Sequence, residues 1–238
     1  MKVVILAGGL GSRLSEYTKK IPKPMVKIGN KPIIEHIMNY YSMFGYNEFI
    51  LAIGYKKNII QEYFKKPKFS KWKIHSIDTG LNSLTGTRIK KLKKFFKKDE
   101  DFFLTYGDGL SNVNLKKLYQ FHKSQKKLFT LTAVRPPARF GELFINGNIV
   151  KSFEEKPQVT KSWINGGFFI INSKFLSFLP QKNHMLEREP LTRLVKLKQV
   201  TAYKHNGFWQ CMDTLRDKEM LHKIYKSGDA EWLKKNKL

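Results

Sequence analysis

A glycine-rich loop after the first apolar segment is the first group of residues suited to chemistry. The apolar run 3–6 leads into AGGLGSR at 7–13. Glycines let backbone N–H groups come close to a phosphate, because no side chain stands in the way. Arg13 and, ten residues later, Lys23 within PKPM at 22–25 add cations suited to polyphosphate charge. This combination predicts a loop that binds nucleotide phosphates.

The residues of this loop do not match either of two better-known glycine-rich motifs. The dinucleotide fingerprint Gly-x-Gly-x-x-Gly fits at Gly9 and Gly11, but Leu14 stands at its third position. Pro22 also prevents a long helix from beginning soon afterwards. The P-loop ends in Gly-Lys-Ser/Thr, whereas this chain has GSR at 11–13. A ligand-free tight turn is the remaining alternative, and the added Arg and Pro-Lys-Pro favour the phosphate loop.

Two aspartates stand where a metal ion could be held. Asp108 lies between two glycines after the apolar segment 102–105, and ligands of open α/β sheets bind at the carboxyl ends of strands. Asp213 follows GFWQCM at 207–212. Mg²⁺ takes one or two carboxylates together with phosphate oxygens and water, so the pair would suit a triphosphate site. The alternatives are a turn or helix-cap aspartate at 108 and the N-cap of the last helix at 213.

The composition is that of a globular protein with a sizeable core. The 238 residues are 41% hydrophobic and 13% aromatic, and no apolar run is long enough for a transmembrane helix. A single cysteine, Cys211, excludes an intramolecular disulfide and a multi-cysteine metal site. The chain passes from Met1 directly into a strand pattern, which is not that of a signal peptide. We therefore expect a cytoplasmic protein.

The formal net charge of +26 raises the question of a polyanionic partner. Lysines are spread over nearly every expected helix, which favours a solvated lysine surface. A specific basic surface is the alternative, and weak attraction to nucleic acid or anionic membranes at low salt fits either one. We expect no specific nucleic-acid partner.

Strands and helices alternate along the chain, which predicts a parallel sheet with helices on both faces. An Asn-Gly turn at 146–147 predicts a hairpin over 143–150. We expect one domain over 1–238, with neither repeats nor linkers. The expected strands are 2–6, 48–53, 73–78, 101–105, 128–134, 163–171 and 200–204. The expected helices are 32–44, 58–64, 85–96, 114–123 and 215–226.

Ten ordered segments together resemble the sugar-phosphate nucleotidyltransferase family, and within it the glucose-1-phosphate cytidylyltransferases. The segments are LAGGLGSRL, PKPMVKIGNKPIIEHIM, GYKKNIIQEYF, DTGLNSLTGTRIKKL, FLTYGDGL, FGEL, SFEEKP, INGGFFIIN, EREPL and GFWQCMDTLRDK. The resemblance implies a Rossmann-like three-layer fold with a mostly parallel central sheet and a small β-rich substrate subregion. Residues 1–135 would mainly bind nucleotide, and 136–238 would mainly bind sugar phosphate and supply the C-terminal helix.

The resemblance also implies site residues for a Mg²⁺-dependent reaction of CTP with a sugar 1-phosphate. The expected catalytic residues are Arg13, Lys23 and Asp108. The expected metal ligands are Asp108 and Asp213. The expected nucleotide-binding residues are Leu6, Ala7, Gly8, Gly9, Gly11, Ser12, Arg13, Lys23, Thr85, Gly86, Arg88, Gly107 and Asp108. The expected sugar-phosphate residues are Tyr106, Gly141, Glu155, Lys156, Asn165 and Gly166.

Several of these residues have a structural alternative. Glu155 and Lys156 could form a charged turn before a proline, and Asn165 could belong to a loop before a strand. Arg88 could donate to cytosine O2 or N3, or it could lie on a solvated helix face. The six histidines show no ligand spacing, and we expect them to be structural.

The chain departs from the glucose-1-phosphate enzymes in one segment. Only residues 65–77 connect the expected helix at 58–64 to the DTG motif, where those enzymes usually carry a longer insertion near subunit contacts and ligand sites. The sugar, which could be another hexose, a heptose or a polyol phosphate, therefore stays open. The oligomeric state also stays open, although the resemblance favours a homo-oligomer. The competing functions are the same chemistry with UTP, dTTP or GTP, and a non-catalytic basic protein that binds RNA or membranes.

Overall fold

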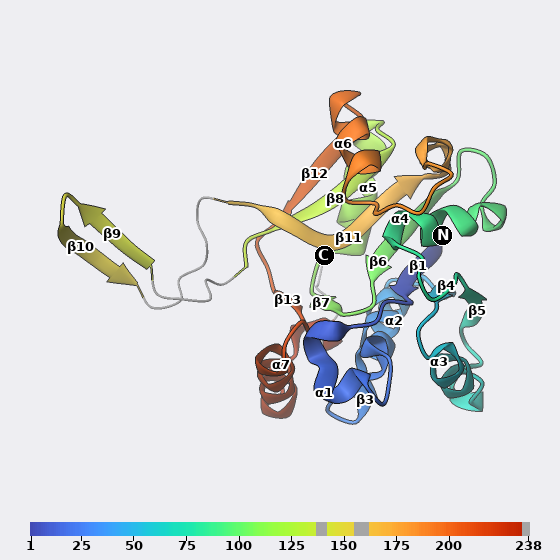
Figure 1. The fold of residues 1–238 in the computed structure, drawn as a ribbon, viewed down its shortest axis with the longest axis horizontal. Helices are drawn as coiled ribbons and strands as arrows, with labels where there is room; N and C mark the ends of the chain where they lie inside the picture. Colours follow the sequence, from blue (N-terminus) through green and yellow to red (C-terminus); the bar gives the residue numbers. More distant parts are fainter. Residues whose placement is uncertain (137–141, 155–161, 235–238) are drawn as a thin grey trace.

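A seven-stranded sheet forms the centre of the fold, in the order β12-β8-β11-β6-β1-β4-β5 (Figure 1). The computed structural model describes residues 1–136, 142–154 and 162–234. Neighbouring strands are parallel except at β11, which is antiparallel to both β6 and β8. The expected α/β fold with a mostly parallel sheet is confirmed. The strands are β1 (Lys2–Ala7), β4 (Glu48–Ile53), β5 (Lys73–Asp78), β6 (Asp101–Tyr106), β8 (Phe129–Val134), β11 (Ile164–Asn172) and β12 (Val200–His205).

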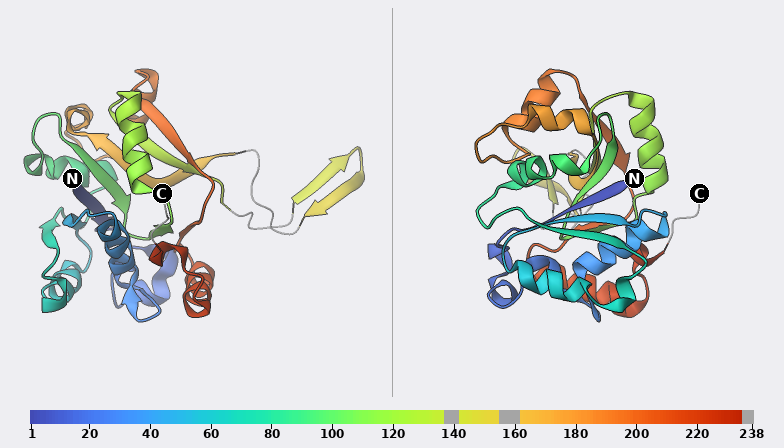
Figure 2. Two further views of the ribbon diagram at one scale, coloured as in Figure 1. Left: turned by 180° about the vertical axis from the view of Figure 1, so that it is seen from behind. Right: turned by 90° about the vertical axis from the view of Figure 1, so that its right-hand side faces the viewer.

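Helices cover both faces of the sheet and bury two separate cores (Figure 2). Side chains alternate along a strand, so Val3 and Ile5 of β1 enter one core while Val4 and Leu6 enter the other. The first core is covered by α2 (Ile33–Met43), α3 (Lys57–Phe64), α5 (Leu115–Gln125) and α7 (Leu215–Ser227). The second is covered by α4 (Thr85–Lys91) and α6 (Glu189–Lys196). The short helix α1 (Ser15–Thr18) follows the glycine loop.

The expected helix at 85–96 is too long. Helix α4 ends at Lys91, and a 3₁₀ turn covers Lys93–Phe95. Phe96 is extended and stacks on Phe102 of β6 with ring centroids 4.0 Å apart. This packing draws the chain away from the helix axis and ends the helix early.

Helix α6 and four short strands were not expected from the sequence. The strands form two small antiparallel pairs, β2 (Lys27–Ile28) with β3 (Lys31–Pro32) and β7 (Gly109–Ser111) with β13 (Trp209–Cys211). Segments of two or three residues are too short for an alternating hydrophobic pattern.

The expected hairpin is present as β9 (Glu142–Asn146) and β10 (Ile149–Glu154), with Gly147 at φ +59° in its turn. It lies apart from the central sheet in Figure 1 and in the left panel of Figure 2. Five apolar side chains of the hairpin are more than half exposed: Leu143, Ile145, Ile149, Val150 and Phe153. Among the described residues, no helix is both long and apolar enough to cross a membrane.

Candidate active site

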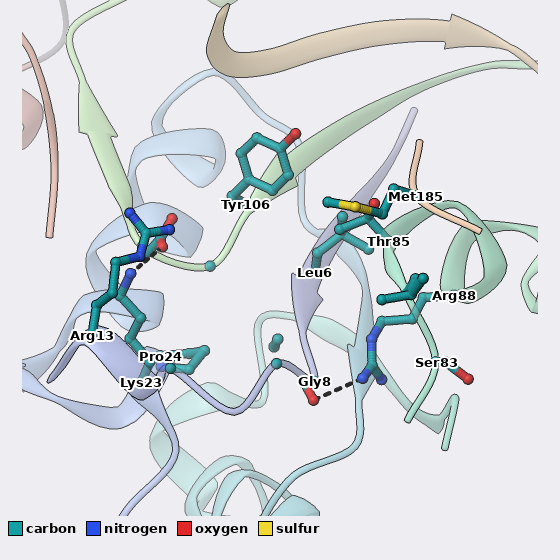
Figure 3. A pocket seen from close by; sticks show the side chains of 16 residues that line it. Leu6, Gly8, Arg13, Lys23, Pro24, Ser83, Thr85, Arg88, Tyr106 and Met185 are labelled. Atoms are coloured by element: carbon teal, nitrogen blue, oxygen red, sulfur yellow. Dashed lines mark hydrogen bonds and ion pairs between the residues drawn. The ribbon is translucent and has the colours of Figure 1, made fainter. Parts of the chain in front are cut away.

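A cavity of about 340 Å³ opens at the carboxyl ends of β1 and β6 (Figure 3). This is the edge of an open α/β sheet at which ligands bind. Twelve of the residues expected from the sequence line it: Leu6, Ala7, Gly8, Gly9, Gly11, Arg13, Lys23, Thr85, Arg88, Tyr106, Gly107 and Asp108. Four residues that sequence reasoning did not single out also line it: Pro24, Ser83, Leu84 and Met185.

The other expected residues lie beside the cavity or outside the described part of the chain. Ser12 is exposed, and a Cβ on Gly86 would lie 2.4 Å from the His184 ring. The Gly166 carbonyl accepts a 2.6 Å hydrogen bond from Trp209 Nε1. Asn165 Oδ1 accepts from the N–H of Gly167, where a Cβ would lie 2.5 Å from the Tyr106 ring. Three expected sugar-phosphate residues fall outside the described residues: Gly141, Glu155 and Lys156.

The glycine loop is held against the segment that carries Lys23. Gly11 has φ +65°, a left-handed conformation that favours glycine. A Cβ at this position would lie 2.9 Å from both Lys23 Cβ and Thr18 Cγ2. The Thr18 hydroxyl donates to the Gly11 carbonyl at 3.1 Å. The loop and Lys23 therefore face the cavity as one unit.

The Lys23 ammonium lies between two carboxylates that are far apart in the sequence. Its Nζ is 2.7 Å from Asp108 Oδ2 and 2.6 Å from Asp213 Oδ1. The other oxygen of Asp213, Oδ2, accepts from Arg13 Nη1 at 2.6 Å. Two cations and two anions thus meet at the mouth of the glycine loop.

A short antiparallel pairing brings Asp213 to Asp108. β7 begins directly after Asp108, and β13 ends two residues before Asp213. Gly109 pairs with Cys211, and the Met212 N–H donates to the Asp108 carbonyl at 2.8 Å. The two carboxylates are therefore placed by backbone hydrogen bonds.

Asp213 is not the N-cap of the last helix, which corrects that alternative. Thr214 caps α7, and its hydroxyl accepts from the Asp217 N–H. The Asp217 carboxylate accepts in return from the Thr214 N–H, which completes a capping box. The Asp213 carboxylate therefore does not cap the helix and instead forms ion pairs with Arg13 and Lys23.

Lys23 is a permanent cation in this setting. Its side chain is almost buried, with 9% of the residue exposed. Burial acts to lower the pKa of Lys23, but Asp108 and Asp213 outweigh burial and raise this pKa above its ordinary value. The nearby thiol of Cys211 stays protonated, because burial followed by the charges of Asp213 and Asp108 raises its pKa to about 12. The site therefore contains a fixed cation and no thiolate nucleophile.

The donor set fits a hard divalent cation shared with a ligand. No group of three or more His, Cys, Asp or Glu side chains converges anywhere in the described residues. Asp108 and Asp213 nevertheless converge on one ammonium beside the glycine loop. Two carboxylates completed by phosphate oxygens and water are the environment that Mg²⁺ takes in nucleotide sites.

Arg88 is not on a solvated helix face, which corrects that alternative. The residue is only 4% exposed. Its Nη1 donates to Thr79 Oγ1 at 2.6 Å and to the Gly80 carbonyl at 2.9 Å. Its Nη2 donates to the Gly8 carbonyl at 2.8 Å (Figure 3) and to the Leu81 carbonyl at 3.1 Å. Nη2 therefore ties the glycine loop to the 79–81 loop, which Nη1 holds by two further bonds. A direct bond from Arg88 to a base stays a prediction.

Replacing Arg88 by Lys should lower the free energy of unfolding by about 2–4 kcal/mol. A single ammonium cannot reach both loops, so buried carbonyls would lose their donors. Urea unfolding measures the effect, and Arg216→Lys at an exposed position of α7 is the matched control. Equal stability of the two variants would refute the loop-tying role.

Glu187 is a site residue that sequence reasoning did not identify. Its Oε1 accepts from the Tyr106 hydroxyl at 2.5 Å, and its Oε2 accepts from Thr85 Oγ1 at 2.6 Å. Burial and then the charge of Glu187 raise the pKa of Tyr106 above its usual range, so the phenol stays a donor. Because Tyr106 and Thr85 both line the cavity, Glu187 fixes the positions of two lining side chains.

This fold and site define a class of protein. A glycine loop at the end of the first strand, a lysine between two aspartates and an open sheet edge together form a site for transfer at a nucleotide phosphate.

Comparison with known proteins gives the family. A model of the nucleotidyl transferase family matches residues 2–219, and the chain belongs to this family of enzymes. The chain is 43% identical to the glucose-1-phosphate cytidylyltransferase of Salmonella typhimurium, with 98% of each chain covered. It is 39% identical to the probable glucose-1-phosphate cytidylyltransferase of Bacillus subtilis, with 98% of this chain and 99% of the relative covered.

A solved structure of HddC from Yersinia pseudotuberculosis has the same fold. It superposes with a TM-score of 0.73 at 27% identity, covering 94% of this chain and 99% of that chain. The alignment with the Salmonella enzyme spans 253 residues, more than the 238 of this chain. That relative therefore has residues without a counterpart here.

Proposed function

We propose that this enzyme transfers CMP from CTP to a sugar 1-phosphate, with glucose 1-phosphate as the first candidate. The products would be a CDP-sugar, for surface polysaccharide biosynthesis, and pyrophosphate. The observation that carries the proposal is the convergence of Asp108 and Asp213 on Lys23 beside the glycine loop. The identity to glucose-1-phosphate cytidylyltransferases over nearly the whole chain supports the choice of CTP and sugar.

The reaction needs positioning and charge stabilisation rather than a covalent enzyme intermediate. An oxygen of the sugar phosphate attacks the α-phosphorus of CTP in line. The bond from that phosphorus to the bridging oxygen breaks, and pyrophosphate leaves with the electron pair. Backbone N–H groups of the loop 8–12 hold the β- and γ-phosphates, while Arg13 and Lys23 stabilise the charge that develops on the leaving group. Mg²⁺ held by Asp108 and Asp213 would neutralise further phosphate charge.

The sugar phosphate would bind on the side of the cavity formed by the second half of the chain. We propose that Lys156 pairs with its phosphate and that Glu155 and Asn165 bond its hydroxyls. Residues 1–135 would then chiefly bind nucleotide and 136–238 chiefly sugar phosphate, within one domain. The remaining sugar-phosphate residues of this proposal are Tyr106, Gly141 and Gly166.

The enzyme would act as a cytoplasmic homo-oligomer. The apolar side chains of the β9–β10 hairpin are exposed in the single chain, and contiguous exposed apolar side chains mark association surfaces. A second copy covering the hairpin would remove them from water. The non-catalytic alternative is not favoured, because the chain belongs to an enzyme family and its glycine loop, Lys23 and Asp108 line one cavity.

Pyrophosphate release across four nucleoside triphosphates and a panel of sugar 1-phosphates tests the proposal. We expect release with CTP and Mg²⁺, at least about 100-fold above UTP, dTTP and GTP, because a base-specific site leaves polar groups unpaired with the wrong base. Chelation of Mg²⁺ should abolish release. Preference for another nucleotide would keep the chemistry but refute the cytidylyl assignment. No release with any pair, together with no binding of CTP·Mg²⁺, would refute the enzyme proposal.

Glu187→Gln should raise the KM for the sugar 1-phosphate about tenfold with a smaller change in kcat. The substitution removes the charge that orients Tyr106 and Thr85 without touching the reacting phosphates. The effects of Glu187→Gln, Tyr106→Phe and the double variant on steady-state kinetics should be non-additive, because the first weakens and the second removes the same hydrogen bond. Glu189→Gln, at an exposed carboxylate on α6, is the control. Additive effects would show that Glu187 does not act through Tyr106.

A further inference from the structure

A second cavity, of about 500 Å³, lies behind the catalytic segment. Residues of α1, the β2–β3 hairpin, α3 and α7 line this cavity. These elements lie together at one end of the molecule (Figure 1, Figure 2). Its volume falls within the range of about 300–1,000 Å³ that is typical of small-molecule sites. The active-site mechanism uses none of the residues that line it.

The lining combines aromatic rings with cations. Tyr17 and Tyr63 contribute rings, and the Nζ atoms of Lys218 and Lys66 lie over them at 4.8 and 4.7 Å from the ring centroids. Lys27 also lines the cavity. Neither Asp nor Glu is among the described residues that line it.

One carboxylate bonded to this lining, that of Glu35, is paired with lysines. Glu35 accepts from the Tyr63 hydroxyl at 2.5 Å. It also pairs with Lys68 at 3.2 Å and with Lys31 at 3.6 Å. The electrostatic potential of the cavity is therefore set by its lysines.

We propose that this cavity binds a nucleotide as an effector. Lys66 and Lys218 would leave the ring faces of Tyr63 and Tyr17 to bind the phosphates, and the base would stack on a ring face vacated in this way. Lysines bind phosphates through charge-assisted hydrogen bonds, and a planar base stacks on an aromatic ring. His222 adds a donor, because its Nδ1 accepts the Gly29 N–H at 3.1 Å and Nε2 then carries the proton.

The two cavities share the elements that carry the catalytic groups. In the 3₁₀ turn Lys23–Met25, Lys23 lines the active site and Met25 lines the second cavity. Helix α7 begins two residues after Asp213, and its Lys218 lines the second cavity within the first turn. A ligand that favours one arrangement of these elements would shift the positions of Lys23 and Asp213, which is the requirement for coupling between two sites.

Equilibrium dialysis with labelled CDP and UDP tests the binding without depending on turnover, whereas the effect on turnover rests on the proposed function. We expect two classes of site per chain for at least one nucleotide. In Lys66→Glu/Lys218→Glu, one class should weaken by about tenfold or more while the other is unchanged. The control Lys223→Glu/Lys226→Glu makes the same charge change at exposed positions of α7 and should keep both classes.

Turnover at saturating substrates should change on addition of the nucleotide in the wild type and the control, but not in Lys66→Glu/Lys218→Glu. A single class of site in the wild type would overturn the proposal, as would two classes that both survive the double substitution. Inorganic phosphate bound as tightly as the nucleotide would refute the role of the rings. Binding without any change in turnover would refute the coupling.

Discussion

Replacing Asp108 by Asn should lower the rate of pyrophosphate release by about 10³-fold. Asn keeps the size of the side chain but removes the charge that faces Lys23 at 2.7 Å. It also leaves Asp213 as the remaining carboxylate beside the phosphate loop. The variant should require a higher Mg²⁺ concentration for its residual activity, which a metal titration of the initial rate measures.

The control for this substitution is Asp99→Asn. Asp99 also pairs with a lysine, Lys174, at 2.6 Å, but on the surface of the protein. Its positive φ of 59° is one that Asn tolerates, so the variant should fold and react normally. A normal rate and metal dependence for Asp108→Asn would exclude Asp108 from the metal pair.

The sheet could be predicted from the sequence because its strands are apolar and flanked by clear turns. The segments 2–6, 48–53 and 101–105 are strands in the structure within one residue of their expected ends. A buried parallel strand gives a near-continuous apolar run, which is visible without any tertiary information. The order of the strands was not predicted, because it depends on pairing between segments that are far apart in the sequence.

The placement of Asp213 beside Asp108 could not be derived from local pattern. It depends on β7 and β13, which have three residues each and pair across a long sequence separation. Resemblance suggested that both aspartates bind metal, but only the structure gives the backbone pairing that joins them.

The role of Arg88 could not be predicted from the sequence either. A helix segment rich in basic residues suggests a solvated face, and spacing cannot show that the acceptors are carbonyls of two separate loops. Glu187 was visible within EREPL as a family segment, but its partners Tyr106 and Thr85 come from other elements. Residues that act by tying loops together have no local sequence signal.

Replacing Lys23 by Met should lower kcat by about 10²–10³-fold, the cost of losing one preorganised donor to a developing phosphate charge. Met preserves most of the side-chain volume, so the loss would come from the charge. The substitution also leaves Asp108 and Asp213 facing each other without the ammonium between them. Because both carboxylates are partly solvated, we expect unfolding to become easier by only about 1–2 kcal/mol.

A double variant separates these two effects of Lys23. Lys23→Met/Asp213→Asn removes the repulsion between the carboxylates, so urea unfolding should show stability recovered toward the wild type. Its rate of pyrophosphate release should stay at or below that of Lys23→Met, because neither change restores a cation. Lys20→Met, at an exposed position, controls for the general loss of a positive charge. Recovery of the rate together with stability would mean that Lys23 acts only by holding the carboxylates together, and that the developing phosphate charge is stabilised by other groups.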